Sequence, residues 1–153
     1  MSKKEQYAWR HKNVGRVMNS TLHRFEDRVM ELMNDAGYTQ TRAPHINLTR
    51  HLDLDGTRIT ILAQRAAMTN AAMTELIDQC ELLGLVKRHP DPTDKRARIV
   101  RFTPQGLEWL NAFGKSLKQS EKEMAAEIGQ EAFRIITESL YNYGATDDSI
   151  EDF

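Results

Sequence analysis

Cysteine and long apolar runs are the scarcest features of this 153-residue sequence. Its one cysteine cannot form a disulfide within the chain, and one thiolate cannot build a cysteine-based zinc cage. The apolar runs are only a few residues long, far below the roughly 20 residues that a membrane-spanning helix needs. The stretch Met1–Gln6 has no apolar region of the kind found in secretory signal peptides. We therefore expect a cytoplasmic protein that has no membrane partner.

Motifs for catalysis are absent as well. The sequence has no glycine-rich phosphate loop, no Gly-x-Ser-x-Gly elbow and no His-Glu-x-x-His motif. Its histidines and carboxylates are scattered, so nothing favours an enzyme, a metal site or a bound cofactor. With 40% hydrophobic and 28% charged residues, the composition is typical of one globular domain over residues 1–153.

The charge is unevenly distributed along the chain. The formal net charge is only −1, which by itself speaks against a nucleic-acid partner. Residues 1–103, however, hold 17 basic and 12 acidic residues, whereas residues 104–153 hold 4 and 10. Residues 86–103 alone contain six cations and two anions. The basic front part favours a polyanionic partner, and a solvated charged hairpin is the alternative.

Apolar residues recur at steps of three and four along most of the chain, which predicts a mainly α (α+β) fold. The first predicted helix covers about residues 8–36. Pro44 suits the first turn of a short second helix. Two further helices are predicted at residues 58–66 and 69–83, and the second of them begins with a threonine that suits an N-cap.

A β-hairpin is predicted after these helices. Residues 86–90 and 97–103 are strand-like, and a polar loop at 91–96 joins them. Two short helices followed by a basic hairpin indicate a winged helix-turn-helix lobe over residues 44–103, with the hairpin as a two-stranded wing. A helix of this kind fits the major groove of DNA, and a hairpin tip reaches the adjacent minor groove.

Long helices flank this lobe on both sides. A helical region covers residues 104–143 and is interrupted at Gly129. Together with residues 8–36, it carries more apolar surface than one small winged domain can cover. We therefore expect both regions to dimerise the chain. Residues 144–153 form an acidic tail that we expect to be disordered.

The residues expected to contact DNA lie on the second helix of the helix-turn-helix and on the hairpin. Asn70 suits an adenine edge, and Ala71 suits a thymine methyl group. Arg96 is expected in the minor groove, with neighbouring cations on phosphates. The full set is Thr69, Asn70, Ala71, Thr74, Lys95, Arg96, Arg98, Arg58 and Arg65.

Simpler structural explanations exist for several of these residues. Thr69 suits a helix cap whether or not it touches DNA. Arg98 is placed to pair with Asp94 and hold the hairpin loop. Lys95 and Arg96 are, on this alternative, ordinary solvated charges.

Residues 57–106 resemble the MarR family of bacterial transcriptional regulators. The most specific segment is GLVKRHPDPTDKRARIVRFTPQG. It contains a basic strand, an Asp-x-x-Asp-x-Arg wing and a Thr-x-x-Gly helix start, and the long flanking helices also match the family's layout. The matching positions are Asp91, Asp94, Arg96, Thr103 and Gly106.

The resemblance implies a homodimeric, ligand-responsive repressor that binds a pseudo-palindromic operator in double-stranded DNA. Each protomer would present one recognition helix to a half-site, with the two half-sites about one helical turn apart. The flanking helices would supply the interface, and packing within one chain is the alternative for each side chain. The interface candidates are Tyr7, Trp9, Phe133, Ile136, Leu140, Tyr141 and Tyr143.

The predicted recognition helix departs from the family pattern in its charge. It carries Glu75, Asp78 and Glu81, with no lysine or arginine on its exposed face. Glu75 suits a cytosine amino group, or alternatively faces phosphate and lowers affinity. Asp78 is expected to pair within the fold.

The resemblance also implies a small aromatic or phenolic effector between the dimerisation helices and the DNA-binding lobe. The candidate pocket residues are Trp9, His11, Arg16, His23, His45 and His51. A remote alternative is a metal site, for which His23 with Glu26, or His45 with His51, would have to converge. Another is a thiol sensor, although Cys80 falls on an apolar face where a thiol is usually inert. A winged-helix module for protein interaction, without DNA binding, is the remaining alternative.

Overall fold

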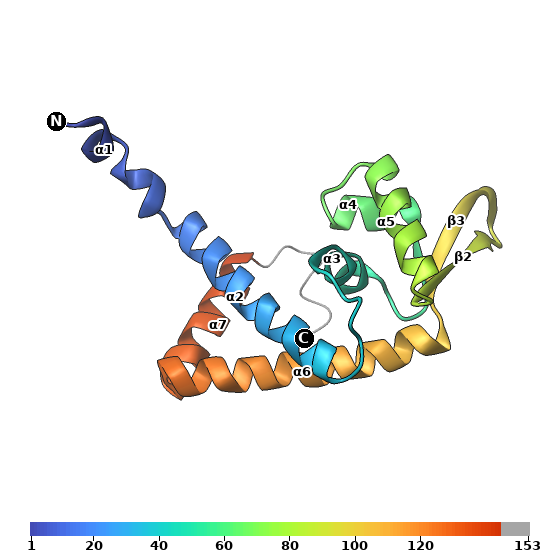
Figure 1. Cartoon of the computed structure of the whole chain (residues 1–153). Coiled ribbons are helices and arrows are strands. Elements are labelled where there is room, and N and C mark those ends of the chain that lie inside the picture. The colour runs from blue at the N-terminus through green and yellow to red at the C-terminus, as the bar shows by residue number, and fades with distance from the viewer. Residues whose placement is uncertain (145–153) are drawn as a thin grey trace.

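The chain folds mainly into helices around a small antiparallel sheet, which confirms the predicted fold class. The computed structural model describes residues 1–144 (Figure 1). Most predicted helices are present with shifted ends. The elements are α1 (Lys3–Gln6), the 3-10 helix η1 (Ala8–His11), α2 (Val14–Asp35), α3 (Ala43–His51), β1 (Thr57–Arg58), α4 (Ile59–Arg65), α5 (Asn70–Leu82), β2 (Val86–Asp91), β3 (Asp94–Phe102), α6 (Pro104–Ile128) and α7 (Gln130–Gly144).

The N-terminal region is not the single helix from residue 8 that the pattern predicts. Asn13 interrupts it with its side chain, whose Oδ1 accepts a hydrogen bond from the backbone of Arg16 at 2.9 Å. Its Nδ2 donates to the carbonyl oxygens of Trp9 and Arg10 at 3.1 and 3.2 Å. Asn13 thereby closes η1 and caps α2, because asparagine side chains compete for backbone hydrogen bonds.

Helices α4 and α5 form the predicted helix-turn-helix, and α3 packs against both of them. Thr69 caps α5, since its Oγ1 accepts a hydrogen bond from the backbone of Ala72 at 3.1 Å. Helix α5 buries Met73, Ile77 and Cys80 in the core, as its apolar spacing predicts. Its opposite face is exposed.

The predicted two-stranded wing is the hairpin of β2 and β3, and a short third strand, β1, joins it in one sheet. In the sheet, β3 lies between β2 and β1, and all neighbours are antiparallel. Thr57 of β1 pairs with Val100 of β3, and both are buried. Strand β1 is only two residues long, so it shows no alternation from which the sequence could have predicted it.

The tip of the wing is tighter than the predicted loop at residues 91–96. Asp91 and Asp94 are paired across the two strands, after a register shift, so only Pro92 and Thr93 turn the chain. The Asp91 carboxylate accepts hydrogen bonds from the backbone and the hydroxyl of Thr93 at 2.9 and 2.8 Å. These bonds stabilise the short turn, which is why the strands extend further than predicted.

The start of α6 is fixed to the turn that follows α5. The backbone of Thr103 donates to the carbonyl oxygen of Leu85 at 3.0 Å, and its hydroxyl donates to that of Gly84. The same hydroxyl oxygen accepts from the backbone of Gly106 at 2.9 Å. Gly106 lies so close to Leu85 that a Cβ atom would overlap the Leu85 carbonyl oxygen. Only glycine fits this position.

A buried tryptophan joins α6 to the loop between α2 and α3. Trp109 is 1% exposed, and its Nε1 donates to Oγ1 of Thr41 at 3.0 Å. Its ring stacks on Phe113 with centroids 5.0 Å apart. Trp109 also belongs to the same core cluster as Leu62 of α4 and Ile77 of α5, so the helix-turn-helix and α6 share one core.

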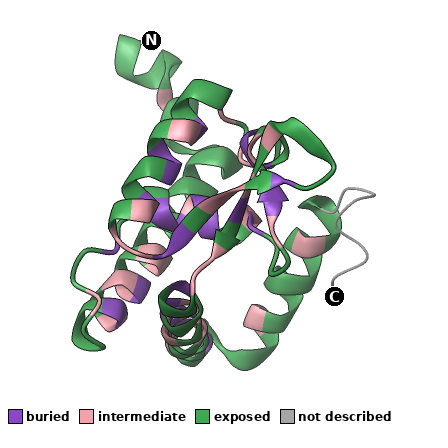
Figure 2. Ribbon diagram, turned by 90° about the vertical axis from the view of Figure 1, so that its right-hand side faces the viewer, coloured by how far each residue is buried: buried purple, intermediate pink, exposed green. Residues whose placement is uncertain are grey.

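The second half of α2 packs on α6, whereas its first half projects away from the body (Figure 1). Two ion pairs join these helices: Arg28 with Glu123 at 2.8 Å, and Arg24 with Glu127 at 2.7 Å. Figure 2 shows exposed ribbon over most of the N-terminal segment and α7, and buried segments around the sheet and its neighbouring helices. Helix α7 has no buried residue.

The C-terminal helical region is divided as predicted. Gly129 ends α6 with φ +100°, a conformation that glycine adopts readily, and α7 begins at the next residue. Apart from Gly144, the predicted acidic tail lies outside the described residues. Within residues 1–144, no helix combines the length and apolar character needed to cross a membrane.

Candidate nucleic-acid interface

The exposed start of α5 is the first part of the candidate interface. Thr69, Asn70 and Ala71 are all exposed there. Thr69 also caps the helix, so its predicted structural role is confirmed. Thr74 is half-buried, and its hydroxyl donates to the carbonyl oxygen of Asn70 at 2.8 Å. The hydroxyl proton of Thr74 is therefore already used within the helix.

An arginine of the wing binds two of the three acidic side chains of α5. Nε and the backbone amide of Arg88 donate to Oε1 of Glu81 at 3.1 and 2.8 Å, and its Nη2 pairs with Asp78. The hydrogen bonds from Arg88 lower the pKa of Glu81. The expected internal pairing of Asp78 is thus confirmed. The spacing of residues along α5 could not identify Arg88 as the partner of Asp78, because Arg88 lies on β2.

The cations at the tip of the wing are exposed. Within residues 1–144, no carboxylate forms an ion pair with Lys95, Arg96 or Arg98. The alternative pair of Arg98 with Asp94 does not form in this part of the chain. Asp94 instead accepts a hydrogen bond from the backbone of Arg96 at 3.0 Å, which holds the turn. The wing therefore presents three uncompensated positive charges close together.

Two other predicted phosphate contacts are engaged inside the protein. Arg58 donates through Nε to Asp91 at 2.7 Å, and the Asp91 side chain is only 4% exposed. Arg65 donates to Asp53 at 2.9 Å and to the carbonyl oxygen of His51 at 3.0 Å. The contact of Arg58 joins β1 to the wing. The contacts of Arg65 join α4 to the end of α3 and the loop that follows it. Because both guanidinium groups are still partly exposed, their contact with phosphate stays a prediction.

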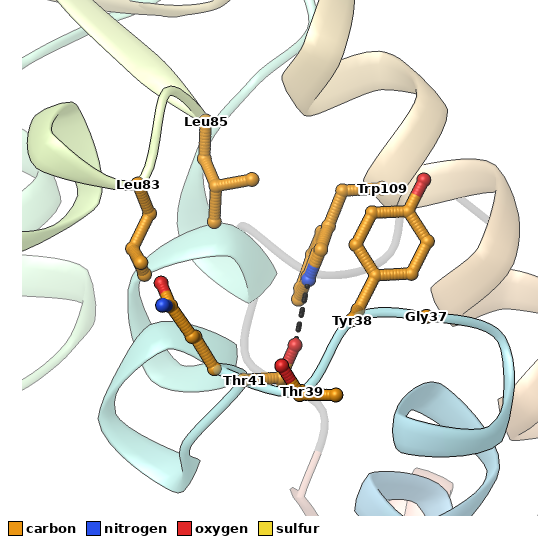
Figure 3. A pocket seen from close by; sticks show the side chains of 8 residues that line it. Gly37, Tyr38, Thr39, Thr41, Leu83, Leu85 and Trp109 are labelled. Atoms are coloured by element: carbon orange, nitrogen blue, oxygen red, sulfur yellow. Dashed lines mark hydrogen bonds between the residues drawn. The ribbon is translucent and has the colours of Figure 1, made fainter.

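A cavity of about 300 Å³ lies where the turn after α5 meets the end of α2 and the start of α6 (Figure 3). Figure 3 shows the hydrogen bond between Trp109 and Thr41 at its edge. A second cavity, of about 550 Å³, lies between α2 and α6. The cavity of Figure 3 is lined by Gly37, Tyr38, Thr39, Gln40, Thr41, Leu83, Leu85 and Trp109.

The predicted pocket residues do not converge in the monomer, and none of them lines either cavity. Trp9 and His11 lie on η1, and Arg16 and His23 lie on the exposed part of α2. The other two belong to α3, where His45 is buried and His51 is half-buried. Burial lowers the pKa of both, and a neighbouring arginine adds to the effect.

The metal and thiol alternatives find no support among the described residues. Within residues 1–144, no three histidine, cysteine or carboxylate side chains are grouped so that they could hold a metal ion. Cys80 is fully buried in the core, and burial raises its pKa to about 12. Such a thiol is not a reactive thiolate at neutral pH.

A capped helix with an exposed polar N-terminus, next to a basic hairpin wing, defines a winged helix-turn-helix protein. No protein-family model matches the sequence. Relatives are nevertheless found by sequence. The chain is 31% identical over 104 residues to an uncharacterized HTH-type transcriptional regulator, YdgJ of Bacillus subtilis strain 168. That match covers 68% of this chain and 62% of YdgJ, so less than two thirds of the relative is matched.

A second relative is matched over more of its length. The transcriptional regulator HosA of Escherichia coli O111:H- is 31% identical over 93 residues, which are 59% of this chain and 69% of HosA.

Solved structures show the same fold. The transcriptional repressor CouR, bound to a 23-mer DNA duplex, superposes with a TM-score of 0.72 at 19% identity, covering 95% of this chain and 99% of CouR. A mutant MarR from E. coli gives 0.69 at 18% identity, covering 86% and 96%. The chain belongs to the MarR family of transcriptional regulators. Both sequence relatives are transcriptional regulators by name.

Proposed function

We propose that the protein is a sequence-specific repressor that binds double-stranded DNA, with α5 in the major groove and the wing in the minor groove. The observation that carries this proposal is the cluster of Lys95, Arg96 and Arg98, whose charges are free of ion pairs in the described chain. These residues lie on the hairpin whose strand β2 contacts the exposed recognition helix. A helix start presents donors to phosphate and base edges. The repressor CouR, which shares the fold, was solved bound to a DNA duplex.

The proposal includes a homodimer. Apolar residues remain exposed along the first half of α2 and along α7, and a single protomer does not cover them. An apolar stripe left exposed on a helix usually marks an interface. Predicted interface residues of η1 and α7 are exposed as well, with Trp9 63% and Leu140 47% exposed. A two-fold dimer would present two α5 helices to the two half-sites of a pseudo-palindrome.

The proposal also includes regulation by a small aromatic effector. The cavity of Figure 3 is the best-supported site, because its lining joins the turn after α5 to the start of α6. No charged side chain lines it, so an uncharged ring suits it better than an anion. A ligand there would favour one orientation of the lobe over another. The Trp9→Phe variant, whose single tryptophan is Trp109, tests binding of phenols by fluorescence quenching and by loss of DNA affinity.

Two substitutions test the docking. Arg96→Ala should weaken binding to most sequences, whereas Asn70→Ala should change the preference among sequences. Both are measured by fluorescence anisotropy on duplexes recovered from an unbiased selection. If the protein binds no duplex, the proposal is wrong and an interaction module without DNA binding becomes the better interpretation. If it binds but neither substitution has an effect, the docking is wrong.

A further inference from the structure

The acidic residues of α5 are not equivalent. Arg88 binds the carboxylates of Asp78 and Glu81, so these two charges are largely compensated within the fold. Glu75 is exposed and, within residues 1–144, forms no ion pair. The recognition helix therefore presents one uncompensated carboxylate.

Glu75 lies at the centre of the outward face of α5. Met73, Leu76 and Ile77 point into the core. Glu75 follows Ala71 by four positions, so both residues lie on the same face of the helix, opposite the core. This position, in the second turn of the helix, faces the floor of a groove when the start of the helix enters it. Phosphates lie at the flanks of a groove and not at its floor.

A carboxylate can only accept hydrogen bonds, which restricts what it can read. In the major groove, guanine presents two acceptors, thymine one acceptor and a methyl group, and adenine a donor beside an acceptor. Cytosine alone presents an amino donor with no neighbouring acceptor on the same base. A carboxylate facing the bases therefore favours cytosine.

We propose that Glu75 is a specificity-determining residue that selects cytosine at one position of each half-site, and that Arg88 keeps the rest of the acidic helix compatible with DNA by binding Asp78 and Glu81. The inference rests on the proposed DNA binding.

The test is an unbiased selection of randomised duplexes with the wild-type chain and two variants, Glu75→Gln and Asp78→Asn. Both variants remove one negative charge from α5, so they share any general electrostatic gain. Glutamine can both donate to and accept from adenine. We expect Glu75→Gln to change one symmetric position of the motif from cytosine to adenine, by about tenfold in relative affinity. Asp78→Asn should keep the wild-type motif.

Each other outcome overturns the inference in a distinguishable way. If Glu75→Gln binds the wild-type motif more tightly without changing it, Glu75 faces phosphate. If both variants change the same position, the effect belongs to the charge of the helix and not to Glu75. If the wild-type chain enriches no motif, the proposed function itself is wrong.

Discussion

Four arginines near the wing fall into two groups according to whether their guanidinium groups bind a carboxylate. Arg58 and Arg88 bind carboxylates of their own chain, and the bond from Arg58 reaches a buried Asp91. Arg96 and Arg98 bind no carboxylate in the described chain. The first group sets the position of the wing, and the second is available to a polyanion. The same residue type is therefore held by carboxylates of the fold at two positions and exposed without an ion pair at two others.

Substitution of the buried carboxylate tests the first group. Hydrogen bonds from Thr93, together with Arg58, hold the pKa of Asp91 below its ordinary 3.8. Because the folded state favours the charged carboxylate, Asp91 contributes to the free energy of unfolding. This contribution is complete above about pH 5 and is lost as the pH falls through the lowered pKa. We expect Asp91→Asn to lower the free energy of unfolding at neutral pH and to weaken its dependence on pH below about 4. Urea denaturation at several pH values measures both effects.

The control for net charge is Asp94→Asn, which removes an exposed carboxylate from the same turn. It should cost less stability at neutral pH than Asp91→Asn. Equal losses would show that the ion pair with Arg58 does not stabilise the wing.

Two glycines of α6 give a matched pair. Gly106→Ala should destabilise the protein by about 1–3 kcal/mol or more, because the new methyl group meets the carbonyl oxygen of Leu85. Gly114→Ala should stabilise it by about 0.5–1 kcal/mol, because nothing lies within 4 Å and alanine favours a helix. Chemical denaturation at one fixed protein concentration measures both. A stable Gly106→Ala variant would contradict the close approach.

At the scale of elements, α2 changes character along its length. Its second half packs on α6 through the core and the ion pair of Arg28 with Glu123. Its first half and α7 leave apolar side chains exposed. Helix α2 buries the apolar residues of its second half within the chain. The apolar residues of its first half can be buried only against another surface, such as that of a second protomer.

The proposed dimer predicts which substitutions separate the protomers. Val17 is 57% exposed and Ile136 is 40% exposed. We expect Val17→Glu and Ile136→Glu each to shift the chain from dimer to monomer, because a charge would be buried in an apolar interface. Leu82→Glu is the control, since Leu82 is 89% exposed but lies at the end of α5. Sedimentation velocity would contradict the interface if all three variants behave as wild type.

The elements also show what the sequence could and could not predict. The three- and four-residue spacing predicted helices α3, α4, α5, α6 and α7 and the apolar face of α5. Strand-like segments around a polar loop predicted the basic hairpin. Both signals are local in the sequence. The break at Asn13 and the two-residue β1 were missed, because one side chain and one pairing decide them. The partners of Arg58 and Arg88 lie 33, 10 and 7 residues away, and no local pattern encodes such contacts.

At the scale of the molecule, the near-zero net charge conceals two regions of opposite sign. The basic region contains the lobe with α5 and the wing, and the acidic region contains α6 and α7. If DNA meets the basic region, the acidic helices are best placed away from the phosphates. The total of −1 is therefore no argument against a nucleic-acid partner.

The salt dependence of binding measures this arrangement. The logarithm of the association constant should fall linearly with the logarithm of salt concentration. We expect Lys95→Ala to reduce the slope by about 2 for a dimer, one phosphate contact in each protomer. Arg24→Ala, which breaks a pair between α2 and α6, should leave the slope unchanged. An unchanged slope for Lys95→Ala would mean that the wing does not touch the backbone.

The junction between Leu85 and Gly106 couples a tilt of α6 to a displacement of α5. The hydrogen bonds and close packing there fix the end of the reading helix to one end of a 25-residue rod. Such a rod is about 37 Å long at 1.5 Å per residue. A tilt of about 5° at its far end would therefore move the junction by about 3 Å, close to the 3.4 Å rise of one base pair. In the proposed dimer, the same tilt of α6 in both protomers would shift both α5 helices relative to their DNA half-sites. A small change of angle among the flanking helices would therefore suffice to release an operator.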